Sequence, residues 1–207
     1  MKLIADQLNN VSRCPHCSVA TPSLKRIFIS SNLVQRATPG PKYGWAVFAC
    51  STCGGCILVR GEPNSYNGST YVQKMFPTPQ EAHEDIPVTA RTYLQQAYET
   101  LHAPDAAAVM AGSAVDAMLK EHGYIDGSVY TRINQAVEKH LLTEAMGEWA
   151  HSVRLGSNRP RHADAENPHV SPDEARQSVE FAEALGHFLF VLTARIQRGI
   201  DAAQQDK

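Results

Sequence analysis

Apolar residues recur every three or four positions through the second half of the chain, and this period predicts amphipathic helices. Five segments show it, at residues 90–101, 107–123, 130–141, 146–153 and 172–203. The last has the clearest start, because Ser171-Pro172-Asp173-Glu174 combines a capping serine, a proline at the first helical position and a glutamate for a capping box. Ser128 and Thr143 are the expected caps of the third and fourth helices. These segments predict an all-α bundle of about five helices.

The first sixty or so residues follow a different pattern. Segments 24–30, 43–49 and 57–59 are typical of short strands, and residues 69–75 allow one more. Glycine and proline gather between residues 61 and 87, which indicates a linker. We therefore predict an α+β chain with a small β module at residues 1–62, a linker at 63–87 and a helical domain at 88–204.

All five cysteines lie in the β module, and none follows Cys56. Cys14-Pro-His-Cys17 and Cys50-Ser-Thr-Cys53 each separate two thiolates by two residues, a spacing that aims both sulfur atoms at one metal ion. Two such pairs complete a tetrahedral site, and this closed geometry leaves no coordination position for catalysis. The sequence predicts a structural zinc ion in a zinc-ribbon module, held by Cys14, Cys17, Cys50 and Cys53.

Two further residues of the module leave alternatives open. Cys56 is either a free thiol or a replacement for Cys53 as a metal ligand, although five intervening residues make a poorer metal-binding turn. His16 lies inside the first cysteine pair, where a role in shaping the turn is favoured over metal binding. A redox role is disfavoured for both pairs, because neither precedes a helix in a βαβ pattern.

Charge and targeting signals restrict the function. Nineteen Lys and Arg against 21 Asp and Glu give a formal net charge of −2, so the chain as a whole has no basic field that would indicate a nucleic-acid partner. The first residues contain no apolar run of signal-peptide length, and the most apolar stretch, residues 188–192, is too short to cross a bilayer. We expect a cytoplasmic protein with reduced thiols and no membrane association.

One dense basic cluster lies between the fourth and fifth helices. Residues 151–164 contain Arg154, Arg159, Arg161 and two histidines around a predicted helix end that glycine and proline interrupt. Guanidinium groups bind phosphate oxygens, and histidine transfers protons near neutral pH, which are the two requirements of metal-free RNA cleavage. The alternative is structural, because the same side chains satisfy the last carbonyls of a helix, with Asn158 as a left-handed cap.

At these residues the chain resembles a bacterial family, domain of unknown function 4145. The run Arg154-x-Gly156-x-Asn158-x3-His162 and the capped helix at Ser171 carry the resemblance, which covers about residues 85–200. Members often have a similar N-terminal cysteine module. The helical domain is in turn similar to the HEPN superfamily, whose members commonly dimerise through their bundles. Many of them are metal-independent endoribonucleases of toxin–antitoxin, restriction and anti-phage systems.

The resemblance implies roles for individual residues. Arg154 would stabilise charge on the phosphate, His162 would transfer the proton and Asn158 would order the turn. Arg159 and Arg161 are expected to hold backbone phosphate. Seven residues separate Arg154 from His162, whereas the RNase signature of the superfamily has four to six.

Two hypotheses for the function follow. In the first, the chain is a homodimeric RNA-acting protein of the prokaryotic defence or toxin type, either a metal-independent endoribonuclease or an RNA-binding protein. In the second, it is a non-catalytic adaptor with structural zinc that binds nucleic acid or a partner protein. Arg154, Asn158 and His162 would then lock the conformation of the turn.

Overall fold

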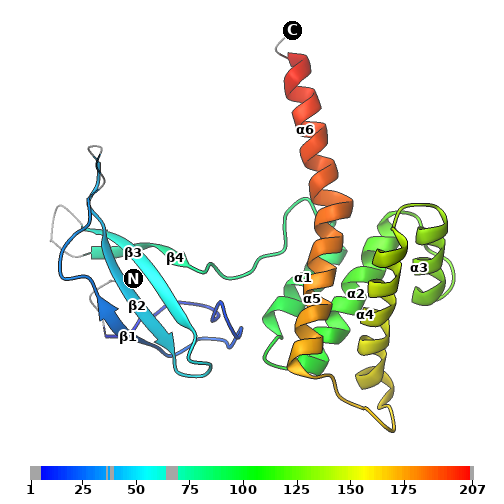
Figure 1. The fold of residues 1–207 in the computed structure, drawn as a ribbon, viewed down its shortest axis with the longest axis horizontal. Helices are drawn as coiled ribbons and strands as arrows, with labels where there is room; N and C mark the ends of the chain where they lie inside the picture. Colours follow the sequence, from blue (N-terminus) through cyan, green and yellow to red (C-terminus); the bar gives the residue numbers. More distant parts are fainter. Residues whose placement is uncertain (1–5, 36, 38–39, 64–69, 206–207) are drawn as a thin grey trace. The chain divides into compact units, whose positions relative to one another are not determined.

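The computed structural model describes residues 6–35, 37, 40–63 and 70–205, and the chain divides into two compact units between Gln80 and Glu81. A four-stranded antiparallel sheet forms the first unit and helices form the second, which confirms the α+β class (Figure 1). None of the described helices has a stretch both long and apolar enough to cross a membrane.

The sheet has the strand order β1-β2-β3-β4 (Figure 1). Its strands are β1 (Leu24–Ile29), β2 (Gly44–Cys50), β3 (Cys56–Pro63) and β4 (Thr70–Phe76). Strand β4 lies inside the segment that the sequence predicts as a linker, at the position where a short strand was allowed. Residues 64–69 of that segment lie outside the described residues.

One face of the sheet carries the core of this unit. Side chains of β2 alternate strictly between buried and half-exposed, as expected for a strand with one covered face. Phe48 and Ile57 are fully buried on the covered face, and Leu8 and Val11 from the preceding segment pack over it. The described residues of the unit do not cover the opposite face in this way, and its side chains in β2 and β3 are partly or largely exposed.

The second unit consists of helices joined by short loops. They are α1 (Val88–Glu99), α2 (Pro104–Glu121), α3 (Val129–Glu138), α4 (Glu144–His162), α5 (Pro172–Gly186), the π-helical turn η1 (His187–Val191) and α6 (Leu192–Gln205). Helix α5 continues through η1 into α6, and α6 projects beyond the other helices of the unit (Figure 1).

The helix starts agree with the local signals in the sequence. The Ser128 and Thr143 hydroxyls accept hydrogen bonds from amides in the first turns of α3 and α4. Ser171 and Glu174 form a complete capping box at the start of α5, with Pro172 in the first turn. All three predicted caps are confirmed, because an N-cap depends on residues within one turn of sequence.

The predicted interruption near the end of α4 is wrong. The helix continues through Gly156 and Pro160 to His162, and Asn158 lies inside it rather than at a left-handed cap. Ala163 is the cap residue, with a φ of 46°. Tertiary contacts from Arg159 and Arg161, on both sides of the proline, hold this last turn in the helix.

The approach of α4 to α2 is unusually close. A Cβ added to Gly112 of α2 would lie 2.6 Å from Ser157 Oγ and 2.7 Å from Ser157 Cβ. The neighbouring residues of α2 are mostly alanine and fully buried, so α1, α4 and α5 all pack against a narrow helix. Gly112 is therefore required by packing and not by backbone conformation.

We expect Gly112→Ala to lower the free energy of unfolding by about 1–3 kcal/mol, because the added methyl overlaps Ser157. Chemical denaturation of the full chain measures the change. Combining it with Ser157→Gly should recover part of the loss, since this removes both overlapping atoms. Gly199→Ala in α6 is the control, because nothing lies within 4 Å of its added methyl. A Gly112→Ala chain as stable as the wild type would refute this packing constraint.

Candidate metal centre and anion pocket

The two cysteine pairs form turns of the same geometry. In the first, the Cys14 amide donates to Val19 O at 3.0 Å and the Ser18 amide donates to Cys14 O at 2.9 Å. The equivalent two bonds around Cys50, in the turn between β2 and β3, measure 3.0 and 2.8 Å. The residue after each second cysteine, Ser18 or Gly54, has a positive φ that closes the turn.

The two turns bring four thiols together. The sulfur atoms of Cys14, Cys17, Cys50 and Cys53 all lie within 4.8 Å of one another, and none forms a disulfide. The Cys14 and Cys53 sulfurs are 3.9 Å apart. Zn–S bonds of about 2.3 Å in a tetrahedron place sulfur atoms roughly 3.8 Å apart, so the cluster fits a four-thiolate metal site with little movement.

The thiols of the cluster differ in acidity. Burial acts to raise the pKa of Cys50, but hydrogen bonds from the backbone amides of Cys53 and Thr52 outweigh it and bring the pKa to about 7. Burial raises the pKa of Cys17 to about 12. A divalent cation would favour the thiolate form of all four cysteines, although it offsets only half of their negative charge, and binding would release protons.

Cys56 and His16 lie outside the thiol cluster. Cys56 is exposed, and its thiol is directed to Gly54 O at 3.9 Å. His16 Nε2 is 2.8 Å from Cys56 O, and its ring lies so close to Gly55 that an added Cβ would be 2.5 Å away. His16 therefore joins the two cysteine turns by direct protein contacts and not as a metal ligand.

A second candidate site is a pocket between α2, α3 and α4 with a volume of 180 Å³. Its polar side chains are Ser128, Tyr130, Arg154, Ser157, Asn158 and Arg161, and the apolar ones come from all three helices. Arg154, Asn158 and Arg161 share one face of α4, because they follow one another at four and three residues. Ser128 and Tyr130 belong to the first turn of α3.

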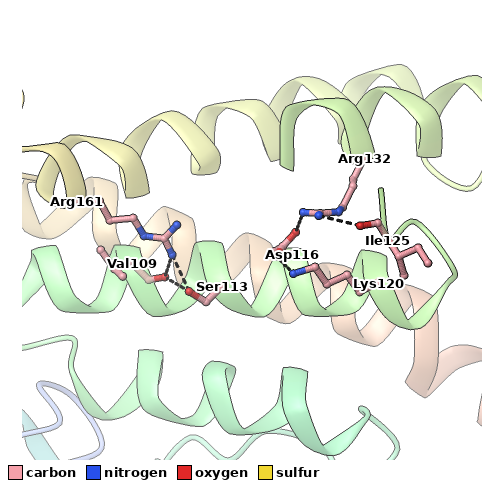
Figure 2. A network of polar contacts seen from close by, with 7 residues as sticks. All are labelled: Val109, Ser113, Asp116, Lys120, Ile125, Arg132 and Arg161. Carbon is pink, nitrogen blue, oxygen red and sulfur yellow. Dashed lines mark hydrogen bonds and ion pairs between the residues drawn. The ribbon is translucent and has the colours of Figure 1, made fainter. Parts of the chain in front are cut away.

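The two arginines of this pocket have no acidic partner among the described residues. Arg154 stacks on Tyr130 with its guanidinium carbon 5.3 Å from the ring centre, and its buried Nε has no hydrogen-bond partner. Arg161 donates through Nη2 to two neutral acceptors, Ser113 Oγ at 2.7 Å and Val109 O at 3.3 Å (Figure 2). No acid lines the pocket, so it carries a net positive charge.

Two neighbouring features agree with this charge. Burial, followed by the charge of Arg154, lowers the pKa of His151, whose Nε2 lies 2.9 Å from Asn134 Oδ1. The pocket also lies at the N-terminal end of α3, where first-turn amides and the helix dipole favour an anion. The arrangement suits a small anion such as a phosphate group.

The remaining predicted site residues lie elsewhere. Arg159 pairs with Glu174 at 2.6 Å; the Ser171 amide and then this arginine lower the pKa of Glu174 to about 2. His162 is exposed and does not line the pocket. Eight residues of α-helix place its Cα about 12 Å from that of Arg154. The structure thus brings together Arg154, Asn158 and Arg161 but leaves Arg159 and His162 outside the pocket.

Sequence reasoning missed the contribution of α3. Ser128 could be predicted as a cap, but nothing in the local sequence indicates that it faces Arg154. The position of α3 depends on an ion-pair network in which the largely buried Arg132 donates through Nη1 to Asp116 Oδ1 at 2.6 Å (Figure 2). Lys120 contacts the other oxygen of Asp116 at 2.6 Å. This network attaches α3 to α2 beside the pocket.

The fold and these sites define a protein with a cysteine-bearing sheet unit and a helical unit that holds a positively charged pocket. The profile of the family described as Domain of unknown function (DUF4145) matches residues 95–201, more than half of the chain. The chain belongs to this family. No curated protein and no solved structure matches it. The likeness of the helical unit to the HEPN superfamily and the zinc-ribbon class of the sheet unit stay predictions.

We expect the purified chain to bind one zinc ion and Cys53→Ser to abolish high-affinity binding, because it removes one of four clustered thiolates. Zinc content and the thiolate-to-metal absorption of the cobalt-substituted chain measure this. Cys56→Ser is the matched control and should keep both signals, since Cys56 lies outside the cluster. Loss of metal in Cys56→Ser with retention in Cys53→Ser would reverse the ligand assignment.

Proposed function

We propose that this protein binds RNA and that the pocket of Arg154, Asn158 and Arg161 holds one backbone phosphate. The observation that carries the proposal is the charge of Arg154, whose buried Nε has no hydrogen-bond partner and whose guanidinium pairs with no carboxylate among the described residues. An uncompensated arginine costs free energy in the free protein, and an anionic ligand would remove that cost.

The dimensions of the pocket support a phosphate group rather than a whole nucleotide. Its 180 Å³ is below the roughly 300–1,000 Å³ of pockets that enclose a drug-sized ligand. Arg161 keeps donors free beyond those that contact α2, and the side chain of Asn158 has no hydrogen-bond partner among the described residues. Phosphate contacts position a strand and carry no sequence information, so binding at this pocket would be tolerant of sequence.

The thiol cluster supports a structural role for zinc in this function. Its ligands come from the two turns that close the sheet unit, and two of them, Cys14 and Cys50, belong to the buried core. A closed four-thiolate site offers no position for substrate. Zinc would therefore stabilise the sheet unit and leave the chemistry to other residues.

We expect Arg154→Gln to weaken binding of an unstructured RNA about tenfold, because it removes one charge-assisted phosphate contact. The slope of log affinity against log salt should fall by about 0.7. Fluorescence anisotropy at several salt concentrations measures both. Arg176→Gln on α5, whose guanidinium pairs with Asp173, removes the same charge away from the pocket and should leave both values unchanged.

Thermal unfolding distinguishes phosphate binding by Arg154 from a role of Arg154 in stabilising the fold. Because Arg154 has no acidic partner, Arg154→Gln should leave the melting temperature within about a degree of the wild type. If Arg154 instead locks the conformation of the turn, the melting temperature should fall by several degrees. Unchanged RNA affinity together with a lower melting temperature would replace the RNA-binding proposal by the structural one.

RNA cleavage is the second candidate function, in a protein of the defence or toxin type that acts as a homodimer. The observation that favours it is the exposure of His162 at the end of α4, where its imidazole has no hydrogen-bond partner among the described residues. Within one chain, His162 lies about 12 Å from Arg154 along α4. A second copy could therefore supply the histidine that faces a phosphate held by Arg154.

If this candidate is right, the chain cleaves RNA in EDTA, and His162→Ala slows cleavage at least about a hundredfold while RNA affinity is kept. Single-turnover cleavage of a labelled RNA measures the rate. Mixing His162→Ala with Arg154→Gln chains should restore activity in mixed dimers. Absence of cleavage by a wild-type chain that binds RNA would leave the non-catalytic adaptor as the function.

A further inference from the structure

The near-neutral charge of the chain conceals two units of opposite sign. Residues 1–80 contain eight Lys and Arg but only Asp6 and Glu62 as acids, a formal charge of +6. Residues 81–207 contain the other eleven Lys and Arg against nineteen Asp and Glu, a formal charge of −8. Four thiolates and one zinc ion together carry a charge of about −2, so the zinc-loaded sheet unit would have a charge of about +4. A polyanion is therefore attracted to the sheet unit.

The uncovered side of the sheet presents aromatic and basic side chains in cross-strand rows. Phe28, Val47, Leu58 and Phe76 are successive partners across β1 to β4. Trp45, Arg60 and Lys74 are partners in the next row, across β2 to β4. We call this surface the outer face, formed by Lys25, Phe28, Trp45, Val47, Leu58, Arg60, Lys74 and Phe76.

The aromatic side chains of the outer face are accessible. Phe28 is 57% exposed and Phe76 is 42% exposed, although aromatic rings usually pack into a core. The Trp45 ring stacks against the Phe76 ring, with ring centres 6.5 Å apart and 28° between the planes. This surface offers flat π-faces at both ends of a row that spans about 14 Å.

The cations of the outer face have no acidic partner among the described residues. Arg60 stacks over Tyr43 at 4.2 Å, and its buried Nε has no hydrogen-bond partner. Lys25 and Lys74 form no ion pair. Glu62 is the only acid in the four strands, and it accepts a hydrogen bond from Gln73 at 2.6 Å. Positive charge therefore borders the exposed rings.

We infer that the outer face is a binding platform for an unpaired nucleic-acid strand, with bases stacked on Phe28, Trp45 and Phe76. Exposed rings interleaved with cations are what single-stranded nucleic acid requires, because every base has a π-face and every linkage a phosphate. A protein partner would favour an apolar face with few charges at its centre, yet Arg60 lies between Trp45 and Lys74 in the middle of the sheet. The platform is distinct from the pocket at Arg154.

Leucine substitutions test stacking against general apolar contact. In the zinc-loaded full chain, Phe28→Leu with Phe76→Leu keeps apolar side chains but removes both π-faces. We expect affinity for oligo-U and oligo-dT of about 12 nucleotides to fall at least about tenfold. Leu33→Ala, at an exposed apolar residue of the same unit outside the strands, is the control and should keep the affinity. Metal content and melting temperature confirm that each variant is folded.

A local signal shows where the strand binds. The chain has two tryptophans, so Trp149→Phe leaves Trp45 as the reporter on the outer face. We expect the oligonucleotides to quench its fluorescence, and Lys74→Gln to reduce the salt slope of binding by about 0.7, whereas Lys139→Gln in the helical unit does not. A stronger response to oligo-U than to oligo-dT would identify RNA as the source of the strand, and the reverse would identify DNA.

Three outcomes would overturn this inference: unchanged Trp45 fluorescence, unchanged affinity in the leucine variant, or a salt slope that Lys74→Gln does not alter. Affinity kept by leucine but lost on Phe28→Ala with Phe76→Ala would show that the oligonucleotide makes general apolar contact with the outer face and does not stack on its rings, which also overturns the inference. Arg154→Gln separates this inference from the function proposed above. If only Arg154→Gln weakens binding, the platform fails; if only the leucine variant does, the pocket proposal fails.

Discussion

The helical unit depends on how closely its neighbours approach α2. This helix presents a buried face of alanine and glycine, so α1, α4 and α5 reach it without large side chains between them. Close packing of α4 at Gly112 and Ser157 places Arg161 within hydrogen-bond distance of α2. The pocket thus depends on backbone proximity, because bulkier residues on α2 would separate α4 from α2 and change the pocket that these helices line.

The sheet unit depends on the thiol cluster as the helical unit depends on close packing against α2. Among its described residues, nine form the buried hydrophobic core, and two of these are Cys14 and Cys50. A core of this size contributes little stability, which is why units of similar size often rely on metals or disulfides. The cluster joins the segment before β1 to the turn between β2 and β3. One face of the sheet is covered in this way, and the outer face remains available for binding.

Signals that act within one or two turns of sequence could be predicted, and those that depend on tertiary contacts could not. The caps at Ser128, Thr143 and Ser171 followed from local spacing and are confirmed. The clustering of the two cysteine pairs is a tertiary contact, but it could be predicted because a tetrahedral metal site needs four ligands and each pair supplies two. The end of α4 could not be predicted, because contacts made by Arg159 and Arg161 override the effect of Pro160. Likewise, the pairing of Arg159 with Glu174 and the position of α3 beside Arg154 depend on how helices pack.

The separation of charge between the units changes how the basic cluster at residues 151–164 is interpreted. In an acidic unit of formal charge −8, three arginines do not create a field that attracts a polyanion from a distance. Arg159 is already neutralised by Glu174. If the pocket at Arg154 binds a phosphate as proposed, it would do so only by direct contact. Under the two proposals, longer-range attraction would come from the basic sheet unit, and the helical unit would supply the geometry that selects a single phosphate.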